Sequence, residues 1–312
     1  CKTHGDFTTT PNGFLSGIRC RKCNNQTSKA EKEIAEFIKE YVDIVESDRS
    51  VLGNLELDIL IPSLNVAIEF NGLYWHSDKH KHNNYHLDKT KNCLAKGIKL
   101  IHIFEDEWRD KKEIVKSRLL NIIGKTETKI FARQCEVREL ESKTVSKFLN
   151  ENHIQGKVGG KVRLGLYYKE ELVSLMTFGN LRKALGSKGT EQDFELLRFC
   201  NKLNTTVVGG ASKLLKYFEN NFDYKTIISY ADRRWSEGNL YFNLGFELVS
   251  ETKPNYFYTK GEFRENRFKY RKSELKAHNK ENRTEKQLME ELGYSRIYDS
   301  GTLKFKKEKP NV

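Results

Sequence analysis

The segment 55–70 restricts the fold more than any other part of the chain. Residues 55–61 read Leu-Glu-Leu-Asp-Ile-Leu-Ile, and this alternation of apolar and acidic side chains predicts a half-buried β-strand. Pro62 to Asn65 have the composition of a turn, and residues 66–70, Val-Ala-Ile-Glu-Phe, predict a second strand. In a hairpin of these two strands, Asp58 and Glu69 lie on the same face. The segment therefore predicts a sheet edge that brings two carboxylates together.

Composition and charge favour an ordered protein with a polyanionic partner. The chain has 312 residues, enough for two domains, and its 18 Phe, 14 Tyr and 3 Trp can build sizeable cores. No apolar run approaches the roughly 20 residues of a membrane-spanning helix, so we expect no membrane partner. Lys and Arg exceed Asp and Glu by 12. This excess favours a polyanionic partner, most simply nucleic acid, and a merely basic soluble protein is the alternative.

The first 25 residues carry two pairs of metal-binding side chains. Cys1 and His4 form a Cys-x2-His pair, and Cys20 and Cys23 form a Cys-x2-Cys pair. Four such ligands suit a tetrahedral zinc ion, which would supply the folding energy of a segment too short to bury a core. We therefore predict a structural zinc knuckle over residues 1–25, against the alternative that the cysteines are incidental.

The other cysteines do not form a disulfide framework, and the sequence shows no signal peptide, so we expect an intracellular, cytoplasmic protein. The first residue is Cys rather than Met, which predicts a fragment of a longer protein.

A helix is predicted to begin after Ser28, with Glu31 in the capping-box position. Its apolar side chains recur at helical spacing at Ile34, Ala35, Ile38, Tyr41, Val42 and Val45. Glu31 falls on the same apolar stripe. It is therefore either a cap or a residue of a functional site.

Elements of a compact α/β domain continue to about residue 128. A polar stretch with His76, His80, His82 and His86 follows the hairpin, and a helix is predicted over about 85–96. Residues 99–104 predict an apolar strand that ends in Glu105-Asp-Glu107, which we interpret as a solvated strand end. A helix is predicted over about 111–123.

The polar residues of this domain suit phosphodiester hydrolysis. Magnesium takes one or two carboxylates, which Asp58 and Glu69 supply, and His76 is placed to act as a general base or acid. Lys89, on the next helix, would stabilise the phosphate. For each residue a structural role is the alternative: a solvated carboxylate, a helix cap or a packed histidine.

Residues 1 to about 125 resemble the very-short-patch-repair endonucleases of the PD-(D/E)XK class. The similarity rests on Ser28-Lys-Ala-Glu31, on Asp58, on Ala67-Ile-Glu-Phe-Asn-Gly-Leu-Tyr-Trp-His76 and on the strand 99–104. It is closer to phage and intron-associated homing endonucleases with a Glu-Asp-x-His-Asp signature, which often carry an N-terminal zinc knuckle.

This resemblance implies that Asp58 binds the metal, that Glu31 lies near the metal waters and that His76 is the active-site histidine. Asn71 stands where the repair enzymes have a histidine and where the wider class has a lysine after its second acid. Proton transfer would then fall on His76, with His86 or Lys89 helping. The assignment of Glu69 as the second acid follows the pattern of the wider PD-(D/E)XK class.

The second half, residues 129–260, resembles the acetyltransferase (GNAT) fold. Strands are predicted over 163–168, 172–178, 194–199, 227–232 and 246–249, with helices after Gly209-Gly210-Ala211 and over 237–243. Ser229-Tyr-Ala-Asp232, Leu240-Tyr and Leu244-Gly-Phe246 resemble phage Mom-type DNA-modification proteins.

The resemblance implies that Gly209, Gly210 and Ala211 bind the pyrophosphate of an acyl-CoA at a helix N-terminus. Thr206 stands where the family has a basic or amide residue, and a purely structural turn is the alternative. The second half is either an acyltransferase that acts on a DNA base, with Tyr230 and Asp232 near its centre, or a degenerate module that binds DNA. We favour the second.

Residues 261–312 are predicted to form a basic extension. Its basic side chains, interleaved with Phe268 and Tyr270, are Arg264, Arg267, Lys269, Arg271 and Lys272. They would contact DNA phosphates, unless the segment is a solvated arm.

Taken together, the sequence predicts an α/β protein: a zinc knuckle and a restriction-endonuclease-like core over 26–128, then an acetyltransferase-like α+β domain. The predicted function, which the resemblance to homing endonucleases implies, is that of a site-directed, magnesium-dependent DNA endonuclease with double-stranded DNA as its partner. The alternatives are a DNA-base acyltransferase with a degenerate nuclease half and a DNA-binding protein without catalysis. The target site, a nick or a double-strand cut, and the oligomeric state are not defined by the sequence.

Overall fold

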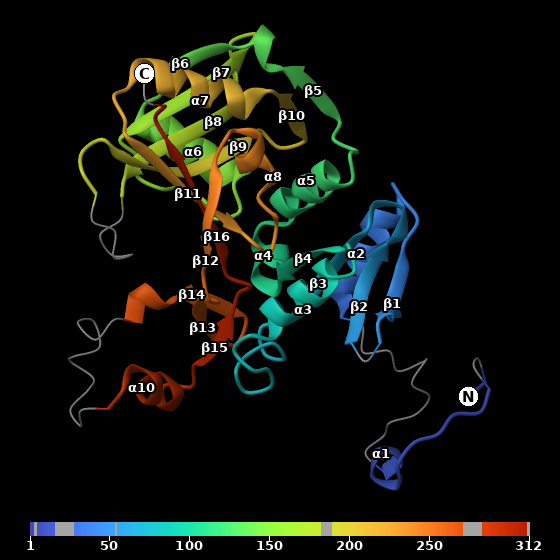
Figure 1. Cartoon of the computed structure of the whole chain (residues 1–312). Coiled ribbons are helices and arrows are strands. Elements are labelled where there is room, and N and C mark those ends of the chain that lie inside the picture. Colours follow the sequence, from blue (N-terminus) through green and yellow to red (C-terminus); the bar gives the residue numbers. More distant parts are fainter. Residues whose placement is uncertain (3–4, 16–27, 54, 182–188, 271–282, 311–312) are drawn as a thin grey trace.

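The computed structural model describes residues 1–2, 5–15, 28–53, 55–181, 189–270 and 283–310. Within them the strands form a four-stranded, a seven-stranded and a three-stranded sheet and one isolated pair. The four-stranded sheet belongs to the first half of the chain and the seven-stranded sheet to the second (Figure 1). The chain is therefore a mixed α/β protein, as expected.

The first half is built around the predicted hairpin. Its sheet has the order β1-β2-β3-β4, in which β4 is parallel to β3 and the other pairs are antiparallel. The elements are α1 (Pro11–Leu15), α2 (Lys29–Lys39), β1 (Val45–Leu52), β2 (Leu55–Ile61), β3 (Val66–Asn71), α3 (Tyr85–Leu94), β4 (Lys99–Phe104), α4 (Glu105–Asp110) and α5 (Lys112–Ile122). The predicted hairpin and the strand 99–104 are confirmed.

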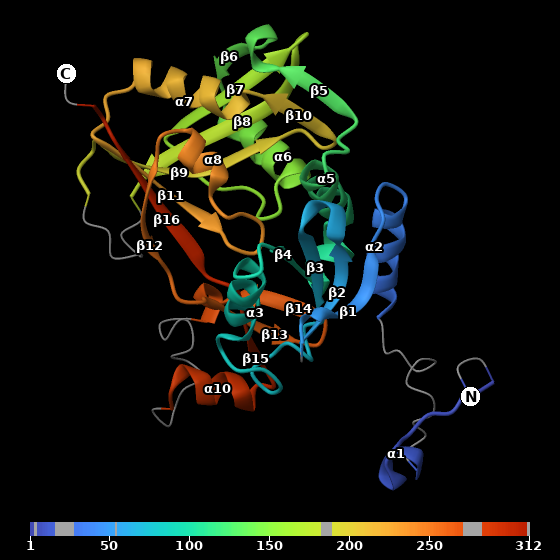
Figure 2. The same ribbon diagram turned by 45° about the vertical axis from the view of Figure 1, so that its right-hand side comes forward.

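Helices cover both faces of this sheet. On one face, Ile59 and Ile68 pack in one buried cluster with Ile34 of α2 and Leu119 of α5. On the other face, Leu60, Ala67 and Leu100 pack with Cys93 of α3. Figure 2 shows α2 and α3 on opposite sides of the strands. Because both faces are covered, polar side chains on β2, β3 and β4 are held in a largely buried environment.

The second half is a seven-stranded sheet with the order β12-β16-β11-β9-β8-β7-β6. Only β9 and β11 are parallel, and α7 connects them. The elements are β5 (Thr128–Phe131), β6 (Glu136–Glu139), α6 (Ser142–Asn152), β7 (Val162–Tyr168), β8 (Glu171–Asn180), β9 (Asp193–Asn201), β10 (Thr205–Val208), α7 (Gly210–Asn221), β11 (Thr226–Asp232), α8 (Asn239–Asn243) and β12 (Glu247–Glu251). The isolated pair is β10 with β5.

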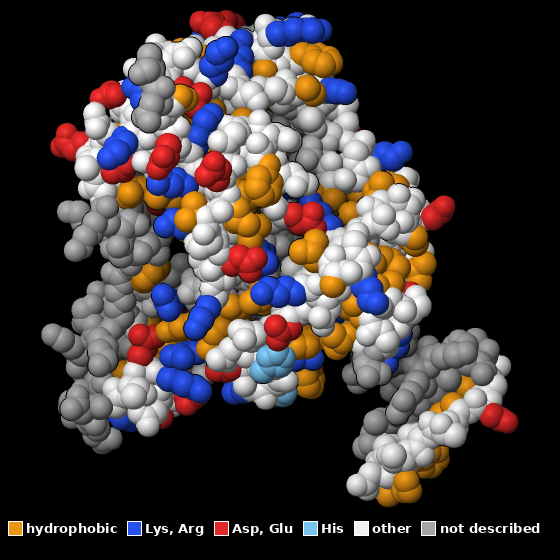
Figure 3. Space-filling model, in the orientation of Figure 1, with side chains coloured by type: hydrophobic (Ala, Val, Ile, Leu, Met, Phe, Trp, Pro, Cys, Tyr) orange, Lys and Arg blue, Asp and Glu red, His pale blue; other side chains and the backbone are white. Residues whose placement is uncertain are grey.

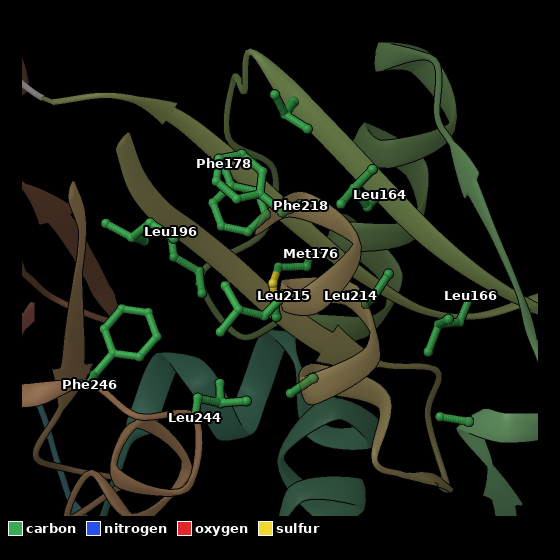
Figure 4. Packing of buried hydrophobic residues seen from close by; sticks show 14 of the residues in the cluster. Leu164, Leu166, Met176, Phe178, Leu196, Leu214, Leu215, Phe218, Leu244 and Phe246 are labelled. Carbon is green, nitrogen blue, oxygen red and sulfur yellow. The ribbon is translucent and has the colours of Figure 1, made fainter. Parts of the chain in front are cut away.

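The core of the second half lies between the sheet and α7. Leu214, Leu215 and Phe218 of α7 face Met176 and Phe178 of β8 (Figure 4). The rings of Phe178 and Phe218 are stacked with centroids 3.9 Å apart. On the opposite face of the sheet, α6 packs through a separate cluster of buried side chains. The sheet is thus the middle layer of three.

Residues 256–270 and 283–308 are folded, which the interpretation as a basic extension did not anticipate. They form β13 (Tyr256–Lys260), β14 (Phe263–Asn266), α10 (Glu285–Glu291), β15 (Ser295–Tyr298) and β16 (Thr302–Glu308). β16 lies between β12 and β11, inside the seven-stranded sheet. Its buried Leu303 and Phe305 alternate with lysines, so the high charge of the segment concealed a strand pattern. Arg271 and Lys272 lie outside the described residues.

The three-stranded sheet β14-β13-β15 lies next to the first half. Ser77, in the loop between β3 and α3, forms a β-bridge with Ile297 of β15. The segment Glu105–Glu107 is also different from its prediction: it begins the helix α4 instead of ending a strand in solvent. No helix of the described residues is long and apolar enough to cross a membrane.

Candidate functional site

Asp58 and Glu69 lie together, as the hairpin predicts. Ile59 pairs with Ile68 in the register of β2 and β3, and one further step places Asp58 opposite Glu69. Asp58 Oδ2 accepts a hydrogen bond of 2.8 Å from the backbone N–H of Phe70. Burial raises the pKa of Asp58 to about 6 and, together with the charge of Asp58, raises the pKa of Glu69 to about 8. Two carboxylates are thus crowded into a site of low polarity.

Glu31 belongs to the same group of acids. Ser28 Oγ accepts a bond of 3.1 Å from the N–H of Glu31, so the predicted cap is confirmed. The return bond of a capping box, from Ser28 N–H to the Glu31 carboxylate, is absent among the described residues. Burial and the nearby charge of Asp58 raise the pKa of Glu31 to about 7. Its carboxylate is therefore available to the site.

Lys89 reaches this group from α3. Its Nζ donates a hydrogen bond to Glu69 Oε1, and both side chains are almost fully buried. Burial alone would lower the pKa of Lys89, but the charge of Glu69 and this bond raise it. Lys89 thus pairs with a carboxylate rather than lying free to meet a phosphate, and its predicted role at the phosphate stays a prediction.

The carboxylates are suited to hold a divalent cation. Glu69 Oε2 is buried and has no hydrogen-bond partner within the described part of the chain. No group of three or more His, Cys, Asp or Glu side chains of that part is arranged to hold a metal ion. Magnesium does not need one, because it binds through one or two carboxylates and keeps several waters. The donor set therefore fits magnesium better than zinc.

His76 and His86 form a hydrogen-bonded pair beside Lys89. His76 Nδ1 lies 2.9 Å from His86 Nε2, and His86 Nδ1 lies 2.6 Å from the carbonyl oxygen of Tyr298. Burial lowers the pKa of His86 to about 4 and holds the pKa of His76 well below its ordinary value. Both rings are therefore neutral at pH 7.

The hydrogen bonds assign the protons of this pair. A carbonyl oxygen only accepts, so His86 Nδ1 carries a proton and His86 Nε2 has a lone pair. His86 Nε2 then accepts from His76 Nδ1, which leaves the lone pair of His76 on Nε2. The chain Tyr298–His86–His76 fixes one basic nitrogen at the site.

Two buried residues complete the polar face, and one of them was missed by the sequence analysis. His102 on β4 pairs in register with Glu69, and its Nδ1 lies 3.3 Å from Asn71 Nδ2. Its Nε2 lies 2.8 Å from Thr90 Oγ1. The alternation of the strand 99–104 was the signal that could have identified His102, because it places His102 beside Glu69 on the same face of the sheet. Asn71 positions His102 and carries no acid–base group of its own.

The interpretation of Glu105–Glu107 as a solvated strand end was wrong, because Glu107 is buried. Arg234, which follows β11, donates from Nη1 to both Glu107 oxygens at 2.9 and 3.0 Å. Arg264 donates to Glu107 Oε1 at 2.9 Å and lies over the ring of Phe104. Arg264 is thus an internal ion-pair partner of the first half, and not the surface contact to phosphate that its position in the basic segment predicted.

The glycine turn before α7 has structural reasons of its own. Gly209 has φ +76°, a conformation that side chains disfavour, and a Cβ on Gly210 would lie 3.1 Å from Val207. Ala211 is buried at the start of α7. Thr206 accepts a hydrogen bond of 2.8 Å from Asn121 of α5. Cofactor binding at Gly209, Gly210 and Ala211 stays a prediction.

The predicted zinc ligands fall largely outside the described residues. His4, Cys20 and Cys23 are not described, and Cys1 is exposed. Zinc binding therefore stays a prediction.

Exposed aromatic side chains flank the histidine pair. Tyr74 and Trp75 are 56% and 65% exposed and contact each other and His80. Figure 3 shows histidine side chains reaching the surface below the centre of the view, with Lys and Arg side chains beside them. Exposed aromatic rings thus lie on the loop that carries His76.

The fold and this cluster define a mixed α/β protein with a buried set of carboxylates, a lysine and neutral histidines. A family model, described as the Mom protein family, matches residues 134–306, more than half of the chain. The chain belongs to the Mom protein family. The predicted similarity to Mom-type proteins is confirmed.

Solved structures with local similarity fall into two groups. The catalytic domain of the homing endonuclease I-Bth0305I is 24% identical, with 30% of this chain and 93% of that chain covered and a TM-score of 0.26. An aminoglycoside 6'-acetyltransferase type Ii is 12% identical, with 57% and 99% covered and a TM-score of 0.34. A Bacillus subtilis acetyltransferase in complex with CoA is 12% identical, with 56% and 99% covered and a TM-score of 0.33. No curated protein matches the chain significantly.

Proposed function

We propose that the first half of the chain is a metal-dependent DNA endonuclease that hydrolyses phosphodiester bonds, as its resemblance to homing endonucleases implies. The observation that carries the proposal is the buried cluster of Asp58, Glu69 and Lys89. Among the described residues Glu69 Oε2 has no hydrogen-bond partner, whereas Glu69 Oε1 accepts from Lys89 and Asp58 lies beside Glu69. This arrangement costs folding stability, and it is best explained by a charged ligand.

Asp58 and Glu69 would hold magnesium in this proposal, with Glu31 near the metal waters. When bound, the ion polarises the phosphate and lowers the pKa of a bound water. Lys89 holds the Glu69 carboxylate in place through its hydrogen bond to Oε1, and Oε2 would then be the oxygen that binds the ion. The low polarity of the site strengthens each of these interactions.

His76 is the group that would accept the proton of the attacking water. Its Nε2 carries the lone pair, and its low pKa keeps that nitrogen unprotonated at neutral pH. His86 is a positioning residue, since it acts by holding the tautomer and the ring orientation of His76. Tyr298 supplies the carbonyl that orients His86.

The surface around the site suits DNA. The net charge of +12 attracts a polyanion, and the exposed rings of Trp75 and Tyr74 are able to stack on bases. We therefore place the scissile phosphate beside His76, with the aromatic pair against the neighbouring nucleotides.

Cleavage by an Asp58→Asn variant tests the proposal. Supercoiled plasmid and long phage DNA are incubated with the whole chain and Mg²⁺, and nicked and linear products are quantified. The variant keeps the shape of Asp58 but removes one charge from the metal site, so cleavage should fall by about 10³-fold or more. Asp88→Asn is the matched control, because Asp88 is an exposed acid on α3. Cleavage by Asp58→Asn at the wild-type rate would disprove the nuclease proposal.

A structural zinc site over residues 1–25 is a separate part of the proposal. Cys1, His4, Cys20 and Cys23 are the four expected ligands. Elemental analysis should find about one zinc per chain, and the Cys20→Ser, Cys23→Ser double variant should lose it. Zinc retained by the double variant would exclude these ligands.

A second candidate function is favoured by the family match over residues 134–306. The resemblance to Mom-type DNA-modification proteins implies transfer of a small group to a DNA base, with acyl-CoA as one donor. The chain carrying Asp58→Asn can be expressed in a bacterial host and the host DNA digested to nucleosides. A nucleoside of altered mass, present only with the protein, would support modification. Its absence would favour a second half that only binds DNA.

A further inference from the structure

The small sheet β14-β13-β15 directs its two faces to different neighbours. Phe257 and Ile297 belong to a cluster that packs against side chains of the first half. Tyr258 packs instead against buried side chains of α10. Side chains alternate along a strand, and residues that are opposite each other in register share a face. The face of Tyr258 therefore also carries Tyr256, Arg296 and Tyr298.

Two guanidinium groups lie at the ring of Tyr256 on this face. The guanidinium carbon of Arg296 is 4.3 Å from the ring centroid, and that of Arg267, which follows β14, is 4.9 Å away. Each contact with the ring is attractive, but two like charges so close to one ring repel each other. An anion bound by both guanidinium groups would relieve this repulsion.

Arg267 has no counter-ion within the described residues. There its guanidinium contacts only the rings of Tyr256 and Phe268, and it makes no hydrogen bond or ion pair. Glu265, two residues earlier in the chain, is engaged by Lys269 and Tyr270 instead. The N–H donors of Arg267 are therefore available to a ligand.

Arg296 carries an unsatisfied donor as well. Its Nη2 donates a hydrogen bond of 3.1 Å to Tyr258 Oη and lies 3.9 Å from Glu285 Oε1. That carboxylate oxygen already accepts from the hydroxyl groups of Tyr256 and Tyr258. Arg296 Nε is buried and has no hydrogen-bond partner in the described part of the chain. A buried charged donor without a partner costs free energy unless a ligand accepts from it.

The two guanidinium groups lie near the loop that carries His76. The ring centroids of Tyr298 and Tyr256 are 5.7 Å apart, and the carbonyl oxygen of Tyr298 lies 2.6 Å from His86 Nδ1. Figures 1 and 2 both show β15 beside the segment between β3 and α3, which it contacts through a β-bridge. The cations therefore belong to the same end of the molecule as the proposed proton acceptor, where they can contact the flanking part of a bound strand.

We propose that Arg267 and Arg296 bind a backbone phosphate of double-stranded DNA that flanks the cleaved bond. A planar guanidinium group matches phosphate oxygens through two parallel hydrogen bonds, and Arg296 Nε would gain the acceptor that it lacks. The proposal rests on the proposed function, because it takes DNA as the substrate of the first half. Phosphate binding by two arginines requires no metal ion, so it can be measured apart from cleavage.

The salt dependence of DNA binding tests this site. Binding of a fluorescein-labelled duplex to the whole chain is measured by anisotropy without added divalent cations, at about 50 to 200 mM NaCl. Each phosphate contact adds about 0.9 to the slope of log affinity against log salt concentration. Arg267→Gln should therefore reduce the slope by about one and weaken binding about ten-fold. An unchanged slope would overturn the proposal, even if the protein cleaves DNA.

Two further variants separate a direct contact from a general loss of charge. Arg267→Lys keeps a cation at the site and should keep the slope. Lys286→Gln is the matched control, because Lys286 is an exposed residue of α10 that pairs with Glu290. It removes the same charge as Arg267→Gln but should keep the wild-type slope, and all three variants should melt like the wild type. An equal loss of slope in Lys286→Gln would reduce the effect to net charge and overturn the assignment.

Competition with inorganic phosphate distinguishes DNA from a free anion. Sodium phosphate should displace the labelled duplex no better than sodium chloride of equal ionic strength, because DNA is held through several phosphates at once. Stronger displacement by phosphate that Arg267→Gln abolishes would assign the site to a free phosphate ion and overturn the proposal. A wild-type chain that binds DNA with the expected slopes but does not cleave it would reject the nuclease function alone.

Discussion

His76 and His86 have different roles although they are a hydrogen-bonded pair of the same residue type. His86 has both nitrogens engaged, one by His76 and one by the Tyr298 carbonyl, so it has no position left for a proton from water. His76 keeps a lone pair on Nε2. The difference between a proton acceptor and a positioning residue therefore follows from the direction of two hydrogen bonds.

Alanine variants of the two histidines should separate these roles. His76→Ala should lower DNA cleavage by about 10²–10⁴-fold, the usual effect of removing a general base. His86→Ala should lower it by about 10–100-fold, as loss of an orienting partner does. The double variant should be no slower than His76→Ala, because His86 acts only through His76. His82→Ala is the control, since His82 is exposed on the same loop. Additive losses in the double variant would contradict the assignment.

Glu107 makes folding stability depend on pH. Burial alone would raise its pKa, but Arg234 and Arg264 outweigh burial and lower the pKa to about 2. A carboxyl group with a lowered pKa stabilises the fold above its unfolded pKa, and this contribution is lost as pH falls toward the folded value. The charge of Glu107 thus contributes on the order of 3 kcal/mol at pH 7, which should disappear between about pH 5 and pH 2.

Chemical denaturation of Glu107→Gln across this pH range measures the effect. The variant should be less stable than wild type at pH 7 and should lose less stability on acidification. Glu113→Gln, at an exposed acid of α5, should follow the wild-type curve. Parallel curves for wild type and Glu107→Gln would show that Glu107 is not the titrating group.

At the scale of elements, the strand β15 holds the loop that carries His76. The N–H of Asp78 donates to the carbonyl of Arg296 at 2.7 Å, and the N–H of Arg296 donates to Asp78 Oδ1 at 2.9 Å. The β-bridge of Ser77 with Ile297 lies directly beside these bonds. A strand of the C-terminal region therefore sets the geometry of a site in the first half.

Substitution of Asp78 tests this docking. Asp78→Ala removes the acceptor of Arg296 N–H, so the amide of Arg296 should exchange with solvent faster and the rate of DNA cleavage should fall. Asp78→Asn keeps an oxygen at the same place and should restore both properties. An alanine variant with wild-type exchange and wild-type cleavage would show that the loop is held by other contacts.

For the whole molecule, the C-terminal residues connect the two halves. β16 lies between β12 and β11 in the seven-stranded sheet, and β15 binds the loop of the first half. The buried ion pairs of Arg234 and Arg264 with Glu107 join the same regions. We therefore expect the halves to unfold together.

Removal of residues 295–312 should abolish this cooperative unfolding. The shortened chain loses β15 and β16, which exposes the edge of β11 and separates β12 from the sheet. We expect insoluble protein, or a broad thermal transition in place of the single sharp one of the intact chain. A soluble truncated chain with an unchanged melting transition would show that residues 295–312 are dispensable for the fold.

Local pattern was sufficient for many elements, although not for β1, β6, α6 or β13 to β15. Alternation over residues 55–61 and 66–70 identified the hairpin and its shared acidic face, and the apolar run 99–104 gave β4 its observed bounds. These predictions held because strand and helix periodicity are properties of neighbouring residues. The pattern of β16 was present as well, but four charged residues among seven led to its interpretation as part of an extension.

The sequence alone did not identify the partner of each buried polar group. Lys89, His86, Glu107 and Arg264 are charged or titratable residues that a pattern assigns to solvent, yet each is paired across a boundary between elements. Their partners are up to 212 residues away in the chain, as for His86 and Tyr298. Periodicity carries no information on such pairs, because burial of a polar side chain depends on which distant segment packs against it. The apolar residues thus define the elements locally, while tertiary packing alone decides which polar residues meet.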